Sequence, residues 1–274
     1  MKIAVCIKQV VTREWQLRVN DQKTWIRDQD AGFELNEPDA YALEEALRLK
    51  EKHGGEVIVC SAGPARATQV IREALARGAD RALHVEADAL ATADANAVAE
   101  ALAGALRDEQ VDLVLTGLQS DDQGFGQVGV VLAEKLGMPH ATLIMEVLVA
   151  PSTSSGPAGA SGQEPAASAS GPGTLRVKRE LEGGWFQWVA LPMPALLTIQ
   201  SGINQLRYAT LKGIMAAKKK EIRKVTPAAA APATQRITSI YFPEKGKKTQ
   251  MLPGAPAEAA KELVKRLRDD ARAL

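Results

Sequence analysis

The sequence predicts an α/β fold with a doubly wound, mostly parallel sheet, followed by a C-terminal arm and a terminal helix. Short apolar runs alternate with amphipathic stretches over residues 1–137, and several of the apolar runs are almost uninterrupted. Alternation of this kind is typical of βαβ units, whose helices cover both faces of a parallel sheet. Strands that are buried on both faces consist of nearly continuous apolar residues.

The expected strands and helices take turns along the first half of the chain. The strands cover 2–8, 56–63, 81–86 and 111–117, and the helices cover 38–54, 65–79, 93–109 and 126–137. Gly54 and Gly78 each follow a helical stretch, where a left-handed residue commonly ends a helix. Right-handed crossovers should connect the strands.

Residues 151–174 contain almost only Pro, Ser, Gly and Ala, which predicts a flexible low-complexity loop. The flanking stretches 142–149 and 174–192 have strand character, and Gly183-Gly184 indicates a turn. The loop therefore joins strands at the edge of the sheet.

The chain changes character near residue 225. We expect an α/β domain over 1–225 and an extended C-terminal arm with a terminal helix over 226–274. Residues 237–243 are expected to form a short strand or arm, and 256–274 an amphipathic helix. Because the linker before them is rich in Pro and Ala, we expect the arm to pack on a partner subunit.

The charge of the chain is unevenly distributed. Residues 1–174 carry 15 Lys/Arg and 25 Asp/Glu, a net charge of −10, whereas residues 175–274 carry 19 and 8, a net charge of +11. This asymmetry indicates contact with a charged partner or an anionic ligand. Nucleic acid is a poor candidate, since only 4% of the residues are aromatic and no stacking or helix-turn-helix motif accompanies the lysines.

Cys6 and Cys60 each end an apolar run, which predicts buried reduced thiols. With two cysteines and three histidines we expect no metal site. The N-terminal residues lack the pattern of a signal peptide, and no apolar run reaches the length of about 18 residues that spans a bilayer. We expect a soluble, cytoplasmic protein without membrane insertion.

The first candidate site is a polar, glycine-rich loop from Gly117 to Gly129, between an expected strand and the helix that begins near Val128. The N-terminus of a helix offers free N–H groups to phosphate, and ligands of open α/β sheets lie at the carboxyl ends of strands. An ordinary strand-to-helix turn is the alternative.

Three other strand-end segments could converge on the same ligand, namely 6–9, 36–39 and 61–64. Asn36 and Asp39 could equally cap the helix that they open.

The second candidate site is the segment 207–220. Leu211, Ile214 and Met215 form an apolar stripe that precedes Lys218, Lys219 and Lys220. A lysine run is usually a solvated helix face. An apolar anchor beside a charged rim, however, is typical of a protein interface.

Residues 207–220 and 177–184 resemble the signature of electron-transfer flavoprotein β subunits. Lys8, Asn36, and residues 44–46, 63–64, 78–80 and 119–129 are similar as well. The resemblance covers nearly the whole chain except 151–174. It implies a Rossmann-like, adenine-nucleotide-binding subunit that has no catalytic residues of its own. In a heterodimer with an α subunit it would accept electrons from flavin dehydrogenases, such as acyl-CoA dehydrogenases, and pass them to a quinone-linked oxidoreductase.

The resemblance also implies the cofactors: an FAD held mainly by the α subunit, and an AMP in this chain. In a bifurcating variant a second FAD would replace the AMP. The implied pocket residues are Cys6, Asn36, Glu37, Pro38, Asp39, Ala62, Asp122, Gln123, Gly124, Phe125, Gly126, Gln127, Val128, Gly129, Val130, Val131, Leu132 and Ala133. The phosphate would meet the N–H groups around Gln127, Val128 and Gly129. Arg13 matches a position near the flavin ring.

The segment 201–220 would recognise the partner dehydrogenase, with Leu211 as its apolar anchor. A stand-alone nucleotide-binding protein of the universal-stress type is the main alternative. It would explain the sheet and the glycine-rich loop, but neither the 207–220 signature nor the arm. A nucleic-acid-binding protein is opposed by the acidic N-terminal part.

Overall fold

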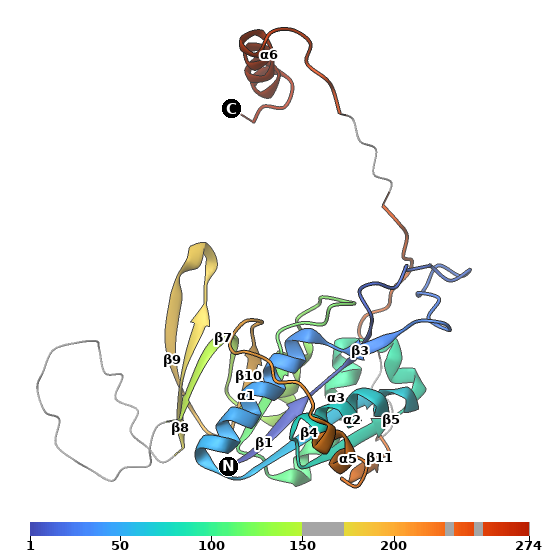
Figure 1. Ribbon diagram of the computed structural model, residues 1–274, viewed down its shortest axis with the longest axis vertical. Helices are drawn as coiled ribbons and strands as arrows, with labels where there is room; N and C mark the ends of the chain where they lie inside the picture. The colour runs from blue at the N-terminus through green and yellow to red at the C-terminus, as the bar shows by residue number, and fades with distance from the viewer. Residues whose placement is uncertain (150–172, 228–232, 244–248, 274) are drawn as a thin grey trace, which may run out of the picture. The chain divides into compact units, whose positions relative to one another are not determined.

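The computed structural model describes residues 1–149, 173–227, 233–243 and 249–273. They form two compact units, Met1–Ser239 and Ile240–Leu274. Figure 1 shows the chain with labels on many of its helices and strands.

The first unit contains a nine-stranded sheet, which confirms the α/β class. Its order is β11-β5-β4-β1-β6-β10-β7-β8-β9. All neighbouring strands from β11 to β7 pair in parallel, whereas the β7–β8 and β8–β9 pairs are antiparallel. The bounds are β1 Lys2–Cys6, β4 Glu56–Gly63, β5 Arg81–Glu86, β6 Leu113–Gly117, β7 His140–Val149, β8 Thr174–Glu180, β9 Phe186–Pro192, β10 Ala195–Ile199 and β11 Ile222–Val225.

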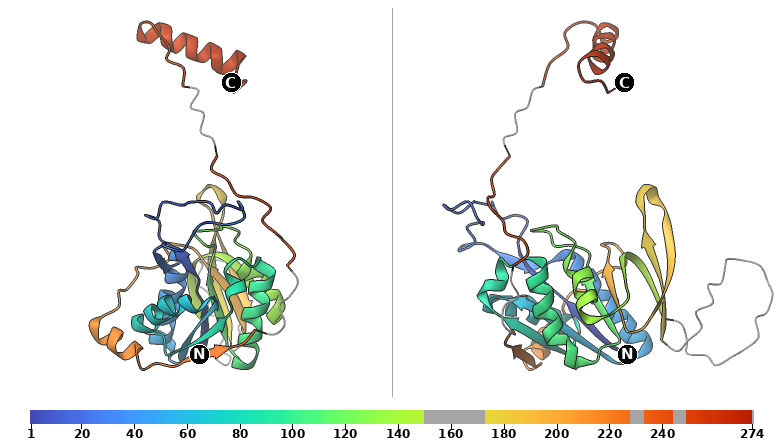
Figure 2. Two further views of the ribbon diagram at one scale, coloured as in Figure 1. Left: turned by 90° about the vertical axis from the view of Figure 1, so that its right-hand side faces the viewer. Right: turned by 180° about the vertical axis from the view of Figure 1, so that it is seen from behind.

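Helices cover both faces of the sheet (Figure 2), so the fold is doubly wound. They are α1 Glu37–His53, α2 Thr68–Arg77, α3 Ala95–Leu106, α4 Val128–Leu136 and α5 Leu211–Ala217. Successive residues of β1 enter different clusters: Ile3 and Val5 pack with α1 and α2, whereas Ala4 and Cys6 pack with α3 and α4. This alternation explains why the strand is apolar throughout.

The central strand, β1, is the point at which the strand order reverses. It pairs with β4 on one side and with β6 on the other, and the chain winds outward in both directions from this pair. In open α/β sheets a crevice forms at the carboxyl ends of the strands at this point.

Several elements differ from the sequence-based expectation. β10 inserts between β6 and β7, and the short strands β2 (Gln9–Val11) and β3 (Phe33–Leu35) form a separate antiparallel pair. The sequence patterns predicted none of β2, β3, β10 and β11. Residues 237–243, expected as a short strand or an arm, have no strand pairing, which leaves the arm.

The antiparallel hairpin β8–β9 lies at the edge of the sheet, as expected, and projects from it (Figure 1). Its turn contains Gly183 and Gly184, both at positive φ. The predicted low-complexity loop lies outside the described residues except for Gly173 and Thr174, and Thr174 is the first residue of β8.

The segment between β10 and α5 is tied to α1. Arg207 donates to Glu44 at 2.7 Å and to Glu51 at 2.6 Å, and Asn204 Nδ2 donates to Glu45 Oε2 at 3.0 Å. These bonds direct the chain across the helices of one face before α5 begins.

The first unit continues beyond residue 225, because Asp94 holds a later part of the chain. Its Oδ2 accepts from the backbone N–H groups of Thr234 at 2.5 Å and Gln235 at 2.8 Å, and from the Thr234 hydroxyl at 2.7 Å. Its Oδ1 accepts from Ala97 N at 2.8 Å and so caps α3. Burial opposes ionisation, but these hydrogen bonds together lower the pKa of Asp94 to about 2.

The second unit contains one helix, α6 (Pro256–Asp269), with no buried residue. Leu263 and Val264 are exposed on it. Among the helices of the described residues, none has the length and apolarity needed to cross a membrane.

Candidate functional site

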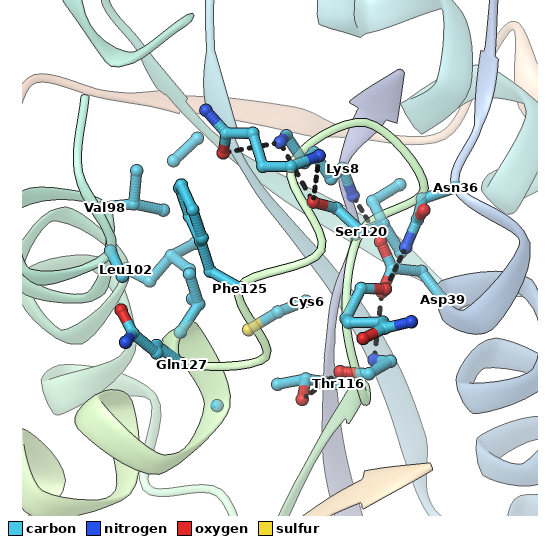
Figure 3. Close-up of a pocket in the computed structure, with 18 of the residues that line it drawn as sticks. Cys6, Lys8, Asn36, Asp39, Val98, Leu102, Thr116, Ser120, Phe125 and Gln127 are labelled. Carbon is cyan, nitrogen blue, oxygen red and sulfur yellow. Dashed lines mark hydrogen bonds between the residues drawn. The ribbon is translucent and has the colours of Figure 1, made fainter. Parts of the chain in front are cut away.

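A pocket of about 840 Å³, a volume that includes solvent at its mouth, lies at the carboxyl ends of β1, β4 and β6 (Figure 3). This is the reversal point of the sheet. The structure brings ten of the predicted cofactor-binding residues together there: Cys6, Asn36, Asp39, Ala62, Gln123, Phe125, Gly126, Gln127, Val128 and Gly129. The pocket has a polar side, a helix N-terminus and an apolar wall.

Asp39 joins the ends of β1 and β6 on the polar side. Its Oδ2 accepts from Lys8 N at 2.7 Å and its Oδ1 accepts from Gly117 N at 2.9 Å. Burial raises the pKa of this carboxyl to about 7, although the hydrogen bonds from Lys8, Asn36 and Gly117 oppose the rise. Gly117 has to be glycine, because a Cβ there would overlap Asp39 Oδ1 and lie 2.7 Å from Pro38 Cβ.

Asn36 precedes α1 but its side chain does not cap the helix. Its Nδ2 donates to Gln119 O at 3.1 Å, and its Oδ1 accepts from Asp121 N at 2.9 Å. The side chain therefore holds the glycine-rich loop, and the capping alternative for Asn36 and Asp39 is wrong. Both side chains instead bond to groups on other parts of the chain, so they are not free to cap the helix.

Lys8, two residues after the end of β1, anchors the same loop. Its Nζ donates to Asp122 Oδ1 at 2.7 Å, to Gln123 Oε1 at 3.1 Å and to Ser120 Oγ at 3.3 Å. The ammonium group of Lys8 thus already has three partners within the protein, one of which is a carboxylate.

The N-terminus of α4 opens toward the pocket. Gln127 stands at the N-cap without a side-chain cap, and the first helical bond runs from Val131 N to Gln127 O. The N–H groups of Val128, Gly129 and Val130 therefore have no partner within the helix. Such groups are suited to an anion.

Gly129 has a different role from its neighbours. A Cβ there would lie 2.6 Å from Thr198 Cγ2 and 2.8 Å from Thr116 Oγ1. Its missing side chain lets α4 pack closely on β6 and β10, so a larger residue would displace the whole helix.

The apolar wall comes from a part of the chain that the sequence-based prediction missed. It consists of residues from η2 (Asp88–Ala91) and the start of α3. They are Leu90, Ala91, Ala93, Ala95, Val98 and Leu102. The available signal was that this helix follows β5, a strand whose carboxyl end lies at the same edge of the sheet.

The other predicted pocket residues do not line the pocket: Glu37, Pro38, Asp122, Gly124, Val130, Val131, Leu132 and Ala133. Leu132 and Ala133 are fully buried between α4 and the sheet. Glu37 and Asp121 both accept a hydrogen bond from the exposed guanidinium of Arg13.

A second hollow of about 520 Å³, again including open solvent, adjoins the first. The two share Lys8, Ala62, Leu90 and Ala91. Trp25, Phe33 and Arg66 line its other walls, and the Arg66 guanidinium lies 4.5 Å from the centroid of the Phe33 ring.

Cys6 and Cys60 are free and buried, as expected, and they are register partners in β1 and β4. Contact with the Cys60 side chain, together with burial, raises the pKa of Cys6 well above its ordinary value. Cys6 is therefore a neutral thiol in the pocket wall. Within the described ranges no group of three His, Cys, Asp or Glu side chains has metal-binding geometry.

The predicted docking segment presents an apolar patch on α5. Leu211 is 78% exposed, Met215 57% and Ile214 45%. Ala217, on the other side of the helix, is buried, and a Cβ at Gly213 would overlap the carbonyl oxygen of Ala76. Gly213 thus lets α5 lie directly on α2, with the patch facing outward.

The lysines beside this patch do not behave alike. Lys218 and Lys219 are exposed. Lys220 instead turns inward, where its Nζ donates to Leu75 O at 3.0 Å and Ala79 O at 2.5 Å, and burial lowers its pKa. Its charge satisfies the carbonyl groups at the end of α2, so the structure gives Lys220 an internal role that composition alone did not reveal.

The chain is similar to a family of known proteins. The family described as electron transfer flavoprotein domain matches residues 24–230. A protein of Methylophilus methylotrophus named electron transfer flavoprotein subunit beta is 35% identical, with 96% of this chain and 97% of that protein covered. The Homo sapiens protein of the same name is 33% identical, with 99% and 98% covered. The Bacillus subtilis protein is 32% identical over the full length of both chains.

Proposed function

The chain belongs to the electron transfer flavoprotein β subunit family, and from this premise we propose that it is the AMP-binding subunit of a heterodimeric electron carrier. The heterodimer accepts electrons from flavin dehydrogenases, such as acyl-CoA dehydrogenases, and passes them to a quinone-linked oxidoreductase. The redox centre is an FAD held mainly by the α subunit, and it supplies the one- and two-electron chemistry. This chain helps to enclose that FAD, binds AMP and docks the dehydrogenase.

The observation that supports the AMP site is the pocket at the reversal point of the sheet. It combines free N–H groups at the start of α4 with an apolar wall from η2 and α3. An anionic phosphate fits the first feature and a purine ring fits the second. The stand-alone alternative accounts for this pocket but not for the family match.

The apolar patch on α5 supports the docking role. Leu211, Ile214 and Met215 are exposed on a helix that is held rigidly, since Arg72 donates to Ala217 O at 2.5 Å and to Lys220 O at 2.8 Å. A preorganised apolar patch loses little entropy when it binds. Lys218 and Lys219 add positive charge at its rim.

Two further surfaces support an α partner. The helix α6 buries none of its residues, so its exposed Leu263 and Val264 are available to a partner. On the β8–β9 hairpin Trp185, Phe186 and Trp188 are exposed. Large exposed apolar side chains that gather in one place commonly mark protein interfaces.

Co-expression with the α subunit tests the proposal. We expect a yellow heterodimer of one-to-one stoichiometry that releases one FAD and one AMP on denaturation, whereas the chain expressed alone should hold little flavin. A colourless chain that does not bind the α subunit would contradict the proposal of a heterodimer. A heterodimer that lacks any nucleotide besides the FAD would contradict the AMP site.

A second FAD in place of AMP is the other candidate, as in a bifurcating carrier. The hollow that adjoins the pocket favours it, because the two share lining residues and a longer ligand would extend from one into the other. Extraction of two FAD and no AMP from the heterodimer would support this variant.

A further inference from the structure

Phe125 is an aromatic side chain that lines the pocket and yet is 49% exposed. Figure 3 places it on the same side as Val98 and Leu102, across from Asn36 and Asp39. Its ring therefore lies at the apolar side of the pocket with about half of its surface open. Flat aromatic faces stack favourably on other ring systems.

Several polar side chains of the pocket are already engaged within the protein. Both oxygens of Asp39 accept backbone N–H groups, and both side-chain polar atoms of Asn36 bond to the loop. Lys8 is paired with Asp122 and bonds to Ser120 and Gln123. These groups therefore shape the pocket, and a ligand has to be recognised mainly by other features.

Two other features of the pocket suit a ligand. One is the set of N–H groups at the start of α4, which suits an anion. The other is the apolar side of the pocket, formed by Phe125 together with the wall from η2 and α3, which suits a ring. Only a molecule that carries both an anionic group and a flat ring uses the whole pocket.

Phe125 stands between two glycines in left-handed conformations, Gly124 at φ +65° and Gly126 at φ +61°. A Cβ added at either glycine would meet nothing closer than 3.6 Å, so these glycines serve the backbone conformation rather than close packing. The pair of left-handed residues turns the loop so that the ring of Phe125 is presented to the pocket.

We propose that Phe125 stacks on the base of the bound nucleotide and makes the site selective for nucleoside phosphates over sugar phosphates. This inference rests on the proposed nucleotide-binding function and adds a residue that determines specificity. Stacking is tolerant of base identity, since every base has a π-face. The phosphate contact alone would bind any small phosphate ester.

The test compares Phe125→Ala and Phe125→Tyr with the wild type in the heterodimer after AMP has been removed. AMP and ribose 5-phosphate are titrated by calorimetry, because they share the phosphate and ribose and differ in the base. We expect Phe125→Ala to weaken AMP about 5- to 150-fold, the range of one base–aromatic contact. Its affinity for ribose 5-phosphate should stay within about twofold of wild type, and Phe125→Tyr should retain AMP. A fluorescent etheno-AMP should be quenched by the wild type and by Phe125→Tyr, but less by Phe125→Ala.

The outcomes separate this inference from the function on which it rests. If the wild type binds AMP and Phe125→Ala binds it equally well, the stacking role is overturned while the AMP site stands. If Phe125→Ala weakens AMP and ribose 5-phosphate to the same extent, Phe125 only supports the loop, and the selectivity is overturned. If the wild type binds no nucleotide, the AMP site itself is wrong, and the inference falls with it.

Discussion

Replacing Leu211 by alanine should slow electron transfer from the cognate flavin dehydrogenase without unfolding the protein. Leu211 begins α5 and is 78% exposed, so it makes little contact with the rest of the chain. The helix depends on other contacts: Thr210 caps it by accepting from Gly213 N at 3.0 Å, and Gly213 packs on α2. Truncation at Leu211 leaves all of them in place.

The magnitude follows from the exposure. A fully buried leucine loses about 2–5 kcal/mol on truncation to alanine. Since only about a fifth of Leu211 is covered, we expect a loss below about 1 kcal/mol and a fall in Tm of at most about 4 °C. An anchor that becomes buried in an interface contributes about 1–3 kcal/mol of binding free energy, so the Kd should rise about 5- to 150-fold.

The assay follows dehydrogenase turnover with increasing heterodimer concentration. Leu211→Ala should raise the KM for the heterodimer by this factor, with flavin content and Tm close to wild type. Leu148→Ala is the control for truncation outside the α5 patch, because Leu148 is a leucine on β7 that is 36% exposed. A large drop in Tm with normal transfer per folded heterodimer would refute the reasoning, as would an unchanged KM.

Three more results are expected. Gly117→Ala should destabilise the protein by about 1–3 kcal/mol in denaturant unfolding, because its Cβ would overlap Asp39 Oδ1; Gly104→Ala, in α3 with nothing within 4 Å of the new Cβ, should be neutral or slightly stabilising. Asp94→Asn should expose the chain around Thr234 to limited proteolysis, since an amide loses either the cap of α3 or the bonds to Thr234; cleavage at the wild-type rate would contradict this. The pKa of Asp39 is raised from 3.8 to about 7, so the folded protein holds this proton more tightly than the unfolded chain. The resulting stabilisation is fully present below about pH 4 and is lost as the pH rises through 7, by at most about 1.4 kcal/mol per pH unit. Unfolding free energies measured from pH 5 to 8 should therefore fall less steeply in Asp39→Asn than in wild type, and equal slopes would refute the assignment.

The docking segment owes its rigidity to charges that lie outside the apolar patch. Arg207 binds two glutamates of α1, and Arg72 binds carbonyl groups at the end of α5. The Glu44 side chain is buried under Arg207, so water cannot easily replace the hydrogen bonds between them. In the proposed docking, partner recognition would then depend on the whole α1–α2–α5 face rather than on one loop.

The sequence by itself determined the parallel sheet, the helices on both faces and the glycine-rich loop. Continuous apolar runs and the helical spacing of apolar residues are local patterns, and each one indicates which residues are buried. The family signature also lies in short segments, so it was readable without a structure. Leu211 was correctly placed on the surface for the same reason, because it stands between polar residues and a lysine run.

Only the tertiary structure decided which residues face the pocket. The insertion of β10 between β6 and β7 depends on pairing between strands far apart in the chain, which no local pattern encodes. Asn36 has the sequence position of a helix cap, and Lys220 that of a solvated lysine. Each instead found a partner on another element: Asn36 in the glycine-rich loop and Lys220 in the carbonyl groups of α2. The apolar wall from α3 was missed for the same reason, because the direction of a side chain depends on neighbours that folding brings together.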